Sequence, residues 1–405
     1  MPDPEIVAAL AKATGSLPHH EDRPSQKTMA DAVANAMNER RHLVVQAGTG
    51  TGKSLAYLVP VVVLGQRAVV STATKALQDQ LAKRDLPQLA EALEARVEFA
   101  VLKGRSNYIC AQRVAEISGG DEQLVMDEAT SVAPEPSLGT LGREIRRLVD
   151  WSAKTPTGDR ADLPFEPTPF AWAQVSVSAR DCPGAARCPS GDRCFAEAAR
   201  EAASSADVII VNTHLYATSL AIGGELLPDH DVVVFDEVHE LEDIASASLG
   251  FEIGAGRFHA LARATRPILE DESAALAVDE AGLMLADALG GHRGSTLPRP
   301  LDDGTLERLV IAKDRVVRLA SEIRKAVRSS SDAGTNVEAG VRARHMRGQQ
   351  AASHLERNLG EVIDLPESKV AWVEGPDHAP LLKVAPIDVG AEMSERLWRT
   401  GNAPT

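Results

Sequence analysis

Along the first 240 residues, segments with apolar positions at helical spacing alternate with short, continuous apolar runs. Helical spacing is present in residues 4–13 (PEIVAALAKA) and in residues 26–40 (QKTMADAVANAMNER). Runs rich in valine and isoleucine predict buried strands in residues 42–46, 97–104, 206–212 and 230–240, and at the start of 67–81, which continues as a helix. Buried strands that alternate with helices are typical of a parallel sheet covered on both faces, so we predict an α/β fold.

The alternation of strands and helices is interrupted twice. Between residues 104 and 206 lies an insertion of roughly a hundred residues, which carries a proline-rich loop at 155–170 and all four cysteines. After residue 240 the pattern becomes helical: residues 261–289 and 305–359 are rich in alanine and leucine, with charges at helical spacing. The chain is therefore predicted to hold an α/β body, a cysteine-bearing insertion and a helical subdomain.

Charge and hydropathy limit the partners. A net charge of −15 does not suit a protein that coats nucleic acid by global attraction, so DNA or RNA would need a local basic groove. No apolar run approaches the roughly 20 residues of a membrane span, and the N-terminus lacks the order of a signal peptide. We therefore expect a cytoplasmic protein without a membrane partner. Cysteines stay reduced there, which favours metal binding over disulfides.

The segment QAGTGTGKS, residues 46–54, matches a phosphate-binding loop. Backbone N–H groups at the start of the following helix would point at the β-phosphate, Lys53 would reach the β- and γ-phosphates, and the Ser54 hydroxyl would bind Mg²⁺. Pro60 is expected to kink or end that helix. The alternative, a glycine-rich turn without a ligand, suits a strand–loop–helix pattern less well. The predicted nucleotide-binding residues of the loop are Ala47, Gly48, Thr49, Gly50, Thr51, Gly52, Lys53 and Ser54.

A second acidic element follows a predicted strand in the segment VVVFDEVHE. There Asp236 would hold Mg²⁺ and Glu237 would polarise the attacking water. An Asp-Glu pair after an apolar strand is weak evidence alone, since it can be a solvated strand end. In a chain with a phosphate-binding loop it predicts nucleotide hydrolysis, with Lys53, Asp236, Glu237 and His239 as the catalytic residues.

Three segments resemble motifs of superfamily 2 helicases. The quartet DEVH resembles motif II, STATKALQDQL (71–81) resembles motif Ia, and RPSQ (23–26) resembles the adenine-reading Q motif. The Gln26 amide could contact both N6 and N7 of adenine, which would favour ATP over GTP. Alone, Arg23 and Gln26 would read as an ordinary helix start after a proline. Their order and distance from the loop favour nucleotide binding.

The four cysteines form one candidate set: Cys110, Cys182, Cys188 and Cys194. Four thiolates with none left over suggest one tetrahedral site, either Zn²⁺ or an iron–sulfur cluster. Their spacing does not separate these two, although zinc sites usually have more closely spaced pairs. Buried apolar cysteines are the alternative, but the neighbours are Gly, Pro, Asp and Arg.

This arrangement resembles the XPD/DinG family of iron–sulfur DNA helicases, and its DinG branch most closely. The segments KGRSNYIC, GDRADLP, CFAEAAREAASSADVIIVN, DEVHELED and APIDVGAEMSERLW carry the resemblance, in that order. It covers the chain from about residue 23 to about residue 398. The resemblance implies a RecA-like domain with a four-iron four-sulfur (4Fe-4S) insertion, a helical Arch domain, and 5′-to-3′ translocation on single-stranded or forked DNA driven by ATP and Mg²⁺.

The resemblance sets the expected domain boundaries. Residues 1–104 and 206–250 would form the RecA-like domain, 105–205 the cluster insertion, 251–365 the Arch-like domain, and 366–405 the return to the motor domain. Gln46 stands where the family commonly has Glu. The family continues into a Ser-Ala-Thr motif and a second RecA-like domain, which this sequence does not contain. We therefore expect weak activity from these residues alone, and a separate chain could supply the second domain.

The candidate DNA contacts are basic or aromatic side chains near motif Ia and the cysteines: Lys75, Lys103, Arg105, Tyr108 and Arg180. Any single one of them could equally be solvated surface charge or packing. The same residues suggest two alternatives to a helicase. One is a catalytically silent ATP- and DNA-binding module with a structural four-cysteine zinc site. The other is a P-loop kinase, which leaves the cysteines unexplained.

Overall fold

The computed structural model describes residues 3–16, 23–48, 50–118, 138–179, 181–224, 226–332, 339–399 and 405. Two compact units are present. The first unit comprises Met1–Lys103, Ala199–Leu249 and Asp388–Thr405, and the second comprises Gly104–Ala198 and Gly250–Ile387. No helix within the described ranges has both the length and the apolar character needed to cross a membrane.

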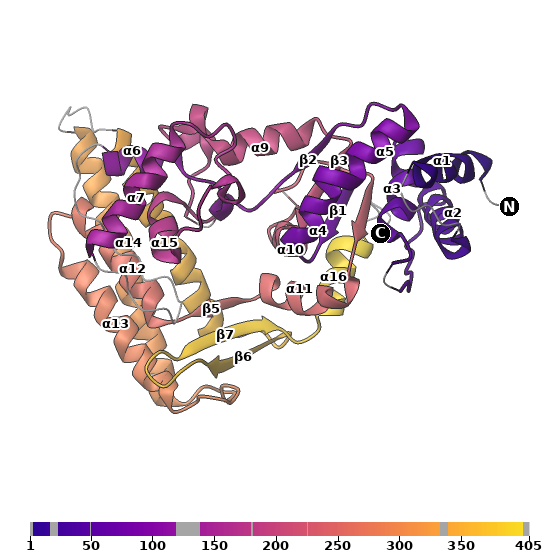
Figure 1. Ribbon diagram of the computed structural model, residues 1–405. Coiled ribbons are helices and arrows are strands. Elements are labelled where there is room, and N and C mark those ends of the chain that lie inside the picture. Colours follow the sequence, from indigo (N-terminus) through magenta and orange to yellow (C-terminus); the bar gives the residue numbers. More distant parts are fainter. Residues whose placement is uncertain are drawn as a thin grey trace. The chain divides into compact units, whose positions relative to one another are not determined.

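The first unit is built on a four-stranded parallel sheet in the order β2-β3-β1-β4 (Figure 1). Central strand β1 (Ala68–Thr72) pairs in parallel with β3 (Val208–Asn212) on one side and β4 (Val232–Phe235) on the other. Strand β2 (Phe99–Val101) adds to the outer side of β3. The predicted parallel sheet is confirmed, with β2 shorter than the apolar pattern suggested.

Both faces of this sheet are covered, as the continuous apolar runs require. Successive side chains of a strand point to opposite faces. In β1, Ala68 and Val70 accordingly belong to one buried cluster and Val69 to the other. Helices α1 (Pro4–Gly15), α2 (Pro24–Asn38), α3 (Lys53–Val63) and α5 (Leu86–Leu93) cover the first face. Helices α10 (Thr213–Ala221), α11 (Leu241–Leu249) and α16 (Val389–Met393) contribute to the second.

One sequence expectation fails locally in this unit. Residues 42–46 form no strand: Val44 is 88% exposed, and the Leu43 N–H donates to the carbonyl of Thr405 at 2.9 Å. A strand exists only when its backbone groups pair with a neighbour, and none of the described strands lies beside this segment. Pro60 does not end α3, which reaches Val63. It is buried inside the helix, where its ring removes the N–H that would otherwise donate to the Ala56 carbonyl, and the kink that this favours stays a prediction.

The chain between β1 and β2 contains α4 (Lys75–Gln80), which runs into a π-helical turn (Leu81–Asp85) before α5. Thr74 caps α4, because its side chain accepts from the Leu77 N–H at 3.3 Å. A second π-helical turn, Ser394–Trp398, follows α16.

The cysteine-bearing part of the second unit is made of short helices and 3₁₀ turns. Helices α6 (Ala111–Ser118), α7 (Leu138–Ser152) and α8 (Pro169–Val175) enclose a small apolar core that includes Ile109 and Trp172. Single 3₁₀ turns lie at Arg105–Asn107, Arg160–Asp162, Ala185–Arg187 and Gly191–Arg193. Helix α9 (Phe195–Ser204) begins in this unit, and its later residues belong to the first unit.

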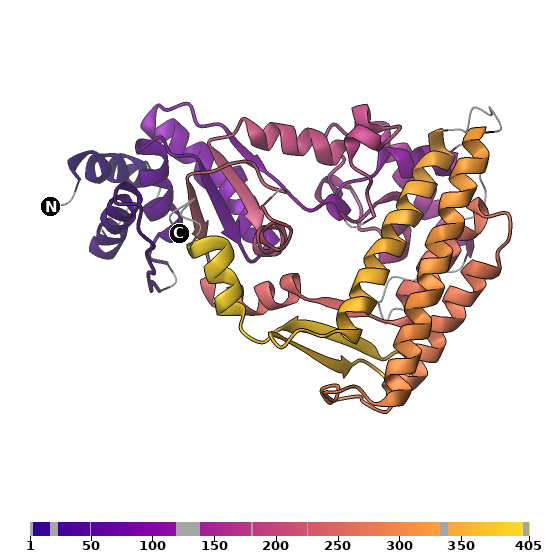
Figure 2. The ribbon, with the colours of Figure 1, turned by 180° about the vertical axis from the view of Figure 1, so that it is seen from behind.

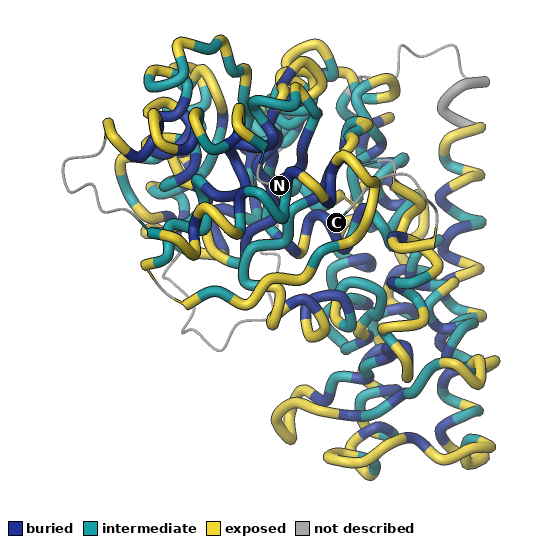
Figure 3. Tube along the Cα trace, turned by 90° about the vertical axis from the view of Figure 1, so that its right-hand side faces the viewer, coloured by how far each residue is buried: buried dark blue, intermediate teal, exposed yellow. Residues whose placement is uncertain are grey.

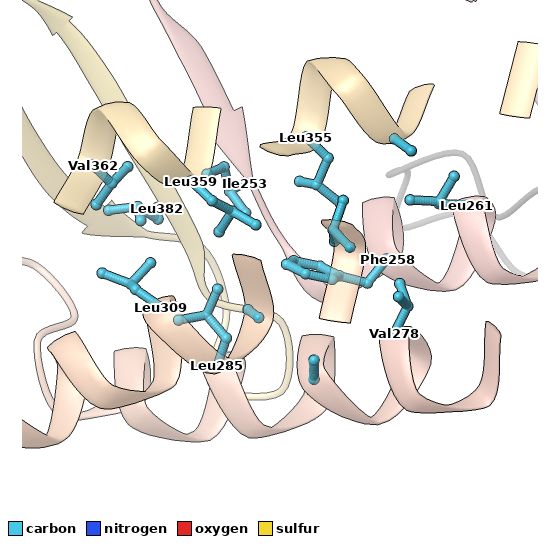
Figure 4. Packing of buried hydrophobic residues seen from close by; sticks show 14 of the residues in the cluster. Ile253, Phe258, Leu261, Val278, Leu285, Leu309, Leu355, Leu359, Val362 and Leu382 are labelled. Atoms are coloured by element: carbon cyan, nitrogen blue, oxygen red, sulfur yellow. The ribbon is translucent and has the colours of Figure 1, made fainter. Parts of the chain in front are cut away.

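The helical part of the second unit is a bundle of α12 (Ala255–Thr265), α13 (Ser273–Gly290), α14 (Asp303–Asp332) and α15 (Ala339–Ile363). These helices lie side by side in both ribbon views (Figure 1 and Figure 2). Buried positions recur among exposed ones along α14, so one face of the helix points into the core (Figure 3). Phe258 is fully buried at the centre of that core, among Leu261, Val278 and Leu355 (Figure 4).

A three-stranded antiparallel sheet accompanies the bundle, in the order β5-β7-β6. It consists of β5 (Phe251–Ile253), β6 (Lys369–Glu374) and β7 (Leu381–Pro386). Ile253, Val373 and Leu382 place this sheet in the same apolar core as the helices. The chain therefore returns to the first unit at Asp388, later than the expected boundary at residue 366.

Candidate nucleotide-binding site and cysteine region

The phosphate-binding loop ends in a backbone shape that requires glycine. Gly50 and Gly52 both have φ near +78°, and Gly52 is the N-cap of α3. A Cβ on Gly52 would lie 2.2 Å from Nε2 of Gln26, so any side chain there would collide with that amide. The left-handed turn leaves the first N–H groups of α3 free to face an anion. Thr49, one of the predicted nucleotide-binding residues, lies outside the described residues.

Arg23 and Gln26 hold the loop by its carbonyl groups. The Gln26 amide donates to the Gly52 carbonyl at 2.9 Å, and the Arg23 guanidinium donates to the Gly50 carbonyl. Gln26 is 5% exposed, although amide side chains usually lie at the surface. The predicted adenine contact of Gln26 remains a prediction, and the structure adds a second role for both residues in shaping the loop.

The carboxylates of motif II are brought to the loop lysine from a distant part of the chain. Asp236 and Glu237 follow the last residue of β4, and the Asp236 N–H donates to the Ser71 carbonyl at 2.9 Å. Lys53 Nζ lies 3.0 Å from Glu237 Oε1 and 4.0 Å from Asp236 Oδ1. Because β4 runs parallel to β1, the carboxyl ends of both strands lie at the same edge of the sheet. Open α/β proteins bind their ligands at this edge. The structure thus places Lys53, Asp236 and Glu237 together.

Glu237 has a left-handed backbone, with φ of 59°, which is uncommon for a residue with a side chain. It begins the 3₁₀ turn Val238–Glu240, and that turn carries His239. The His239 ring lies 3.5 Å from the Glu237 carboxylate and its side chain is 70% exposed. His239 is therefore placed at the outer side of the acidic pair and not at its centre.

Tyr57 is a site residue that sequence reasoning missed. Its hydroxyl donates to Asp236 Oδ2 at 3.2 Å and also interacts with the Ser54 hydroxyl. Burial, followed by the charge of Asp236, raises the pKa of Tyr57 well above its ordinary value, so the hydroxyl keeps its proton. The available signal was helical spacing, because Tyr57 lies one turn beyond Ser54 on the same helix.

All four cysteines belong to the second unit, whereas the phosphate-binding loop belongs to the first. All four cysteines are half-buried free thiols. Burial raises the pKa of both Cys110 and Cys188, and the charge of Cys182 raises it further in each case. Cys194 likewise raises the pKa of Cys188. Cys182 therefore lies near enough to both Cys110 and Cys188 for its charge to affect them, and the single four-cysteine site stays a prediction.

Close packing of two 3₁₀ turns brings the later cysteines toward α6. A Cβ on Gly191 would lie 2.1 Å from the carbonyl oxygen of Ala185, so the turns that precede Cys188 and Cys194 touch through backbone. The buried Ser190 hydroxyl donates to the side-chain amide oxygen Oε1 of Gln112 at 3.0 Å. Within the described ranges, which hold all four thiols, no three Cys, His, Asp or Glu side chains are grouped tightly enough to hold a metal ion.

The predicted DNA contacts are placed unevenly. Lys75 is exposed at the start of α4, and Lys103 is half-buried. Arg105 donates to Glu197 at 2.8 Å and lies 3.8 Å from the Cys194 sulfur, so its charge is already engaged beside the cysteines. The proposed stacking role of Tyr108 is not supported, because this ring is 4% exposed and packs inside the unit. Arg180 lies outside the described residues.

Comparison with known proteins agrees with this site. Residues 23–132, which contain the Arg23–Gln26 segment and the loop, match the DEAD/DEAH box helicase family. The ATP-dependent helicase DinG of Mycobacterium tuberculosis is 43% identical over 271 residues, which are 64% of this chain and 40% of that protein. Over about two thirds of its length, this chain is similar in sequence to a DinG helicase.

A second similar protein is the ATP-dependent DNA helicase YoaA of Escherichia coli, 38% identical over 263 residues, or 63% of this chain and 38% of that protein. A solved structure titled XPD helicase superposes with a TM-score of 0.48 at 13% identity, covering 95% of this chain and 57% of that one. The chain spans about two fifths of the length of its DinG and YoaA relatives.

Proposed function

We propose that this chain is the ATP-binding and ATP-hydrolysing part of a DNA helicase of the DinG type. One observation carries the proposal: Lys53 of the phosphate-binding loop and the Asp236–Glu237 pair meet, although more than 180 residues separate them. The 43% identity to DinG over this part of the chain supports the choice of helicase over other P-loop enzymes.

In this proposal the loop residues bind and orient ATP. The free N–H groups at the start of α3 would face the β-phosphate, and Lys53 would exchange its ion pair with Glu237 for the γ-phosphate. Released from Lys53, the Glu237 carboxylate would be free to accept a proton from the attacking water. Ser54 and Asp236, linked through the Tyr57 hydroxyl, would hold Mg²⁺. Bound Mg²⁺ would offset negative charge on the phosphates.

Helicase activity would couple this hydrolysis to 5′-to-3′ movement on single-stranded or forked DNA. Lys75 and Lys103 in the first unit remain candidate phosphate contacts, together with Arg105 beside Cys194 and Arg180, which precedes Cys182 by two residues in the sequence. Local basic groups are required because the chain as a whole carries a charge of −15. By the same resemblance, the bundle α12–α15 would correspond to the Arch domain, and the protein would act in the cytoplasm.

Tested alone, these 405 residues would bind ATP and turn it over slowly. The resemblance places the arginines that stabilise the transferred phosphoryl group on a second RecA-like domain, and such arginines are worth on the order of a thousandfold or more in rate. That domain would come either from further residues of the same polypeptide or from a separate chain.

We also propose that Cys110, Cys182, Cys188 and Cys194 hold the 4Fe-4S cluster of this helicase. In support, the donor chemistry fits: all four thiols lie in one unit, the charge of Cys182 raises the pKa of Cys110 and Cys188, and Arg105 offers positive charge near Cys194. The described side chains are not yet grouped as a ligand cage, so cluster binding would require them to close together. When bound, the cluster would supply a redox-active iron–sulfur centre at this position.

The test of the proposed function is ATP hydrolysis by the 405-residue chain with and without single-stranded DNA. We expect low, DNA-stimulated turnover that is lost in Lys53→Ala and in Glu237→Gln. Retained turnover in both variants would contradict the assignment of the site.

The cysteine proposal needs its own measurement, namely iron, labile sulfide and zinc in anaerobically purified chain, with Cys188→Ser as control. About four irons per chain in the unaltered protein, and a lower iron content in the control, would support the cluster. Zinc without sulfide would instead indicate the ATP- and DNA-binding module with a structural zinc site.

A further inference from the structure

Tyr57 joins the two side chains to which the proposed function assigns Mg²⁺. Its hydroxyl lies 3.2 Å from Asp236 Oδ2 and interacts with the hydroxyl of Ser54. The residue is 3% exposed, and its ring belongs to the apolar core beneath the sheet. Ser54 and Tyr57 are three positions apart on α3, so both point to the same side of the helix.

The hydroxyl of Tyr57 donates to only one of the two oxygens of the Asp236 carboxylate. Oδ1 accepts from the Glu237 N–H at 3.1 Å, and Lys53 lies 4.0 Å from the same oxygen. Oδ2 accepts from Tyr57. The terminal torsion of an aspartate is broad in energy, so one bond on Oδ1 leaves the carboxylate plane poorly fixed. A second bond on Oδ2 fixes it.

A purely structural explanation also exists, since a buried tyrosine hydroxyl needs some hydrogen-bond partner. Phenylalanine, however, would fill the same apolar space without bringing a hydroxyl against a buried carboxylate. Tyr216 offers a comparison: it too is 3% exposed in this unit, but its hydroxyl pairs with His230, which is not a site residue.

We propose that Tyr57 is a positioning residue for divalent-cation binding, whose hydroxyl holds the Ser54 hydroxyl and the Asp236 carboxylate in the arrangement that the cation requires. This inference rests on the proposed function, because it assumes that Ser54 and Asp236 bind the cation. Groups that orient metal ligands typically change metal affinity about tenfold or more when removed.

The test compares Tyr57→Phe with the unaltered 405-residue chain, using a fluorescent ATP analogue titrated with Mg²⁺. We expect the Mg²⁺ concentration for half-maximal binding to rise about tenfold in Tyr57→Phe. Nucleotide affinity in EDTA should change by less than about twofold, because the loop N–H groups and Lys53 remain. Tyr216→Phe is the matched control, and its Mg²⁺ dependence should equal that of the unaltered chain.

A double-mutant cycle with Asp236→Asn identifies the route of the effect. If Tyr57 acts through Asp236, adding Tyr57→Phe to Asp236→Asn should produce little further change in Mg²⁺ dependence. Full additivity of the two substitutions would overturn the inference, and so would an unchanged Mg²⁺ dependence in Tyr57→Phe alone.

A second measurement avoids the variant, in case Tyr57→Phe does not fold. The unaltered sequence labelled with 3-fluorotyrosine has three tyrosines, and Tyr108→Phe and Tyr216→Phe assign the remaining ¹⁹F signal to Tyr57. That signal should shift when Mg²⁺ is added to the ATP-bound chain, and an unmoved signal would overturn the inference. Failure of the unaltered chain to bind nucleotide in a Mg²⁺-dependent way would instead contradict the proposed function.

Discussion

The Lys53 ammonium lies 3.0 Å from the Glu237 carboxylate, so the loop lysine is paired with the residue proposed to act on water. Both side chains are about one third exposed, at 27% and 35%. A γ-phosphate bound at the loop would compete with Glu237 for this lysine. ATP binding therefore has to replace an existing ion pair.

Glu237→Gln should accordingly tighten ATP binding while it abolishes hydrolysis. An ion pair at this exposure contributes up to about 1 kcal/mol, so ATP affinity should rise by up to about fivefold. Equilibrium binding of a fluorescent ATP analogue checks this, with Lys53→Ala as the control that weakens binding. Weaker binding in Glu237→Gln than in the unaltered chain would show that the ion pair does not compete with nucleotide.

His230 should make the first unit sensitive to acid. Nδ1 is paired with the Pro228 carbonyl at 3.0 Å and Nε2 with the Tyr216 hydroxyl at 3.1 Å, an arrangement that suits a neutral ring. Burial, with the nearby charge of Arg67, lowers the pKa of His230 below its ordinary value, although Asp229 and Asp231 oppose the shift. The unfolded chain therefore takes up this proton at higher pH than the folded chain.

The sign of the stability effect follows from this depressed pKa. The folded state keeps its full contribution from His230 above about pH 6.5 and loses it as the pH falls from there through the folded pKa. The loss is at most about 1.4 kcal/mol per pH unit. Urea unfolding at several pH values should show a smaller acid loss in His230→Gln than in the unaltered chain. Parallel curves for the two proteins would contradict the prediction.

Gly282 should tolerate no side chain, because a Cβ there would lie 2.6 Å from the Cβ of Phe258. Glycine-to-alanine changes inside helices normally stabilise by about 1 kcal/mol. Gly282→Ala in α13 should instead destabilise the second unit by about 1–3 kcal/mol, through overpacking against a fully buried ring. Gly256→Ala in α12, where nothing lies within 4 Å, is the matched control and should not destabilise. Chemical unfolding measures both, and equal effects would show that the core yields at Phe258.

A half-buried ion pair should stabilise the second unit between α15 and α6. Arg347 lies 2.7 Å from Glu116, and their side chains are 14% and 9% exposed. Glu116 also accepts from Gln112, which bonds Ser190 of the cysteine region. Arg347→Met leaves the Glu116 carboxylate with the Gln112 amide and a longer contact of 3.8 Å to Arg113, so we expect a loss of up to about 3 kcal/mol.

Tryptophan fluorescence during urea unfolding checks this value, because three of the four tryptophans, Trp151, Trp172 and Trp372, lie in the second unit. The double variant Arg347→Met/Glu116→Gln should recover part of the loss, since it also removes the unpaired charge. A loss in Arg347→Met below about 1 kcal/mol would place this pair with ordinary surface ion pairs.

Local patterns were sufficient for much of the fold and of the nucleotide site. The apolar runs at β1, β3 and β4 needed no tertiary information, because a strand buried on both faces has a nearly continuous apolar sequence. The glycines around Lys53 and the acidic pair after β4 could be predicted for a similar reason, because their chemistry depends on residue type and short spacing. The segment 42–46 shows the limit, since its apolar residues suit a strand that has no described neighbour to pair with.

What the sequence by itself determined is the set of chemical groups: the phosphate-binding loop, the Asp-Glu pair, the four cysteines and the helical region after residue 250. Only the tertiary structure decided which groups meet. It paired Lys53 with Glu237, set the Tyr57 hydroxyl against Asp236, turned Gln26 toward the Gly52 carbonyl and buried Tyr108. These relationships join residues of different elements, and distances between elements depend on how cores pack, which no local spacing of residues encodes.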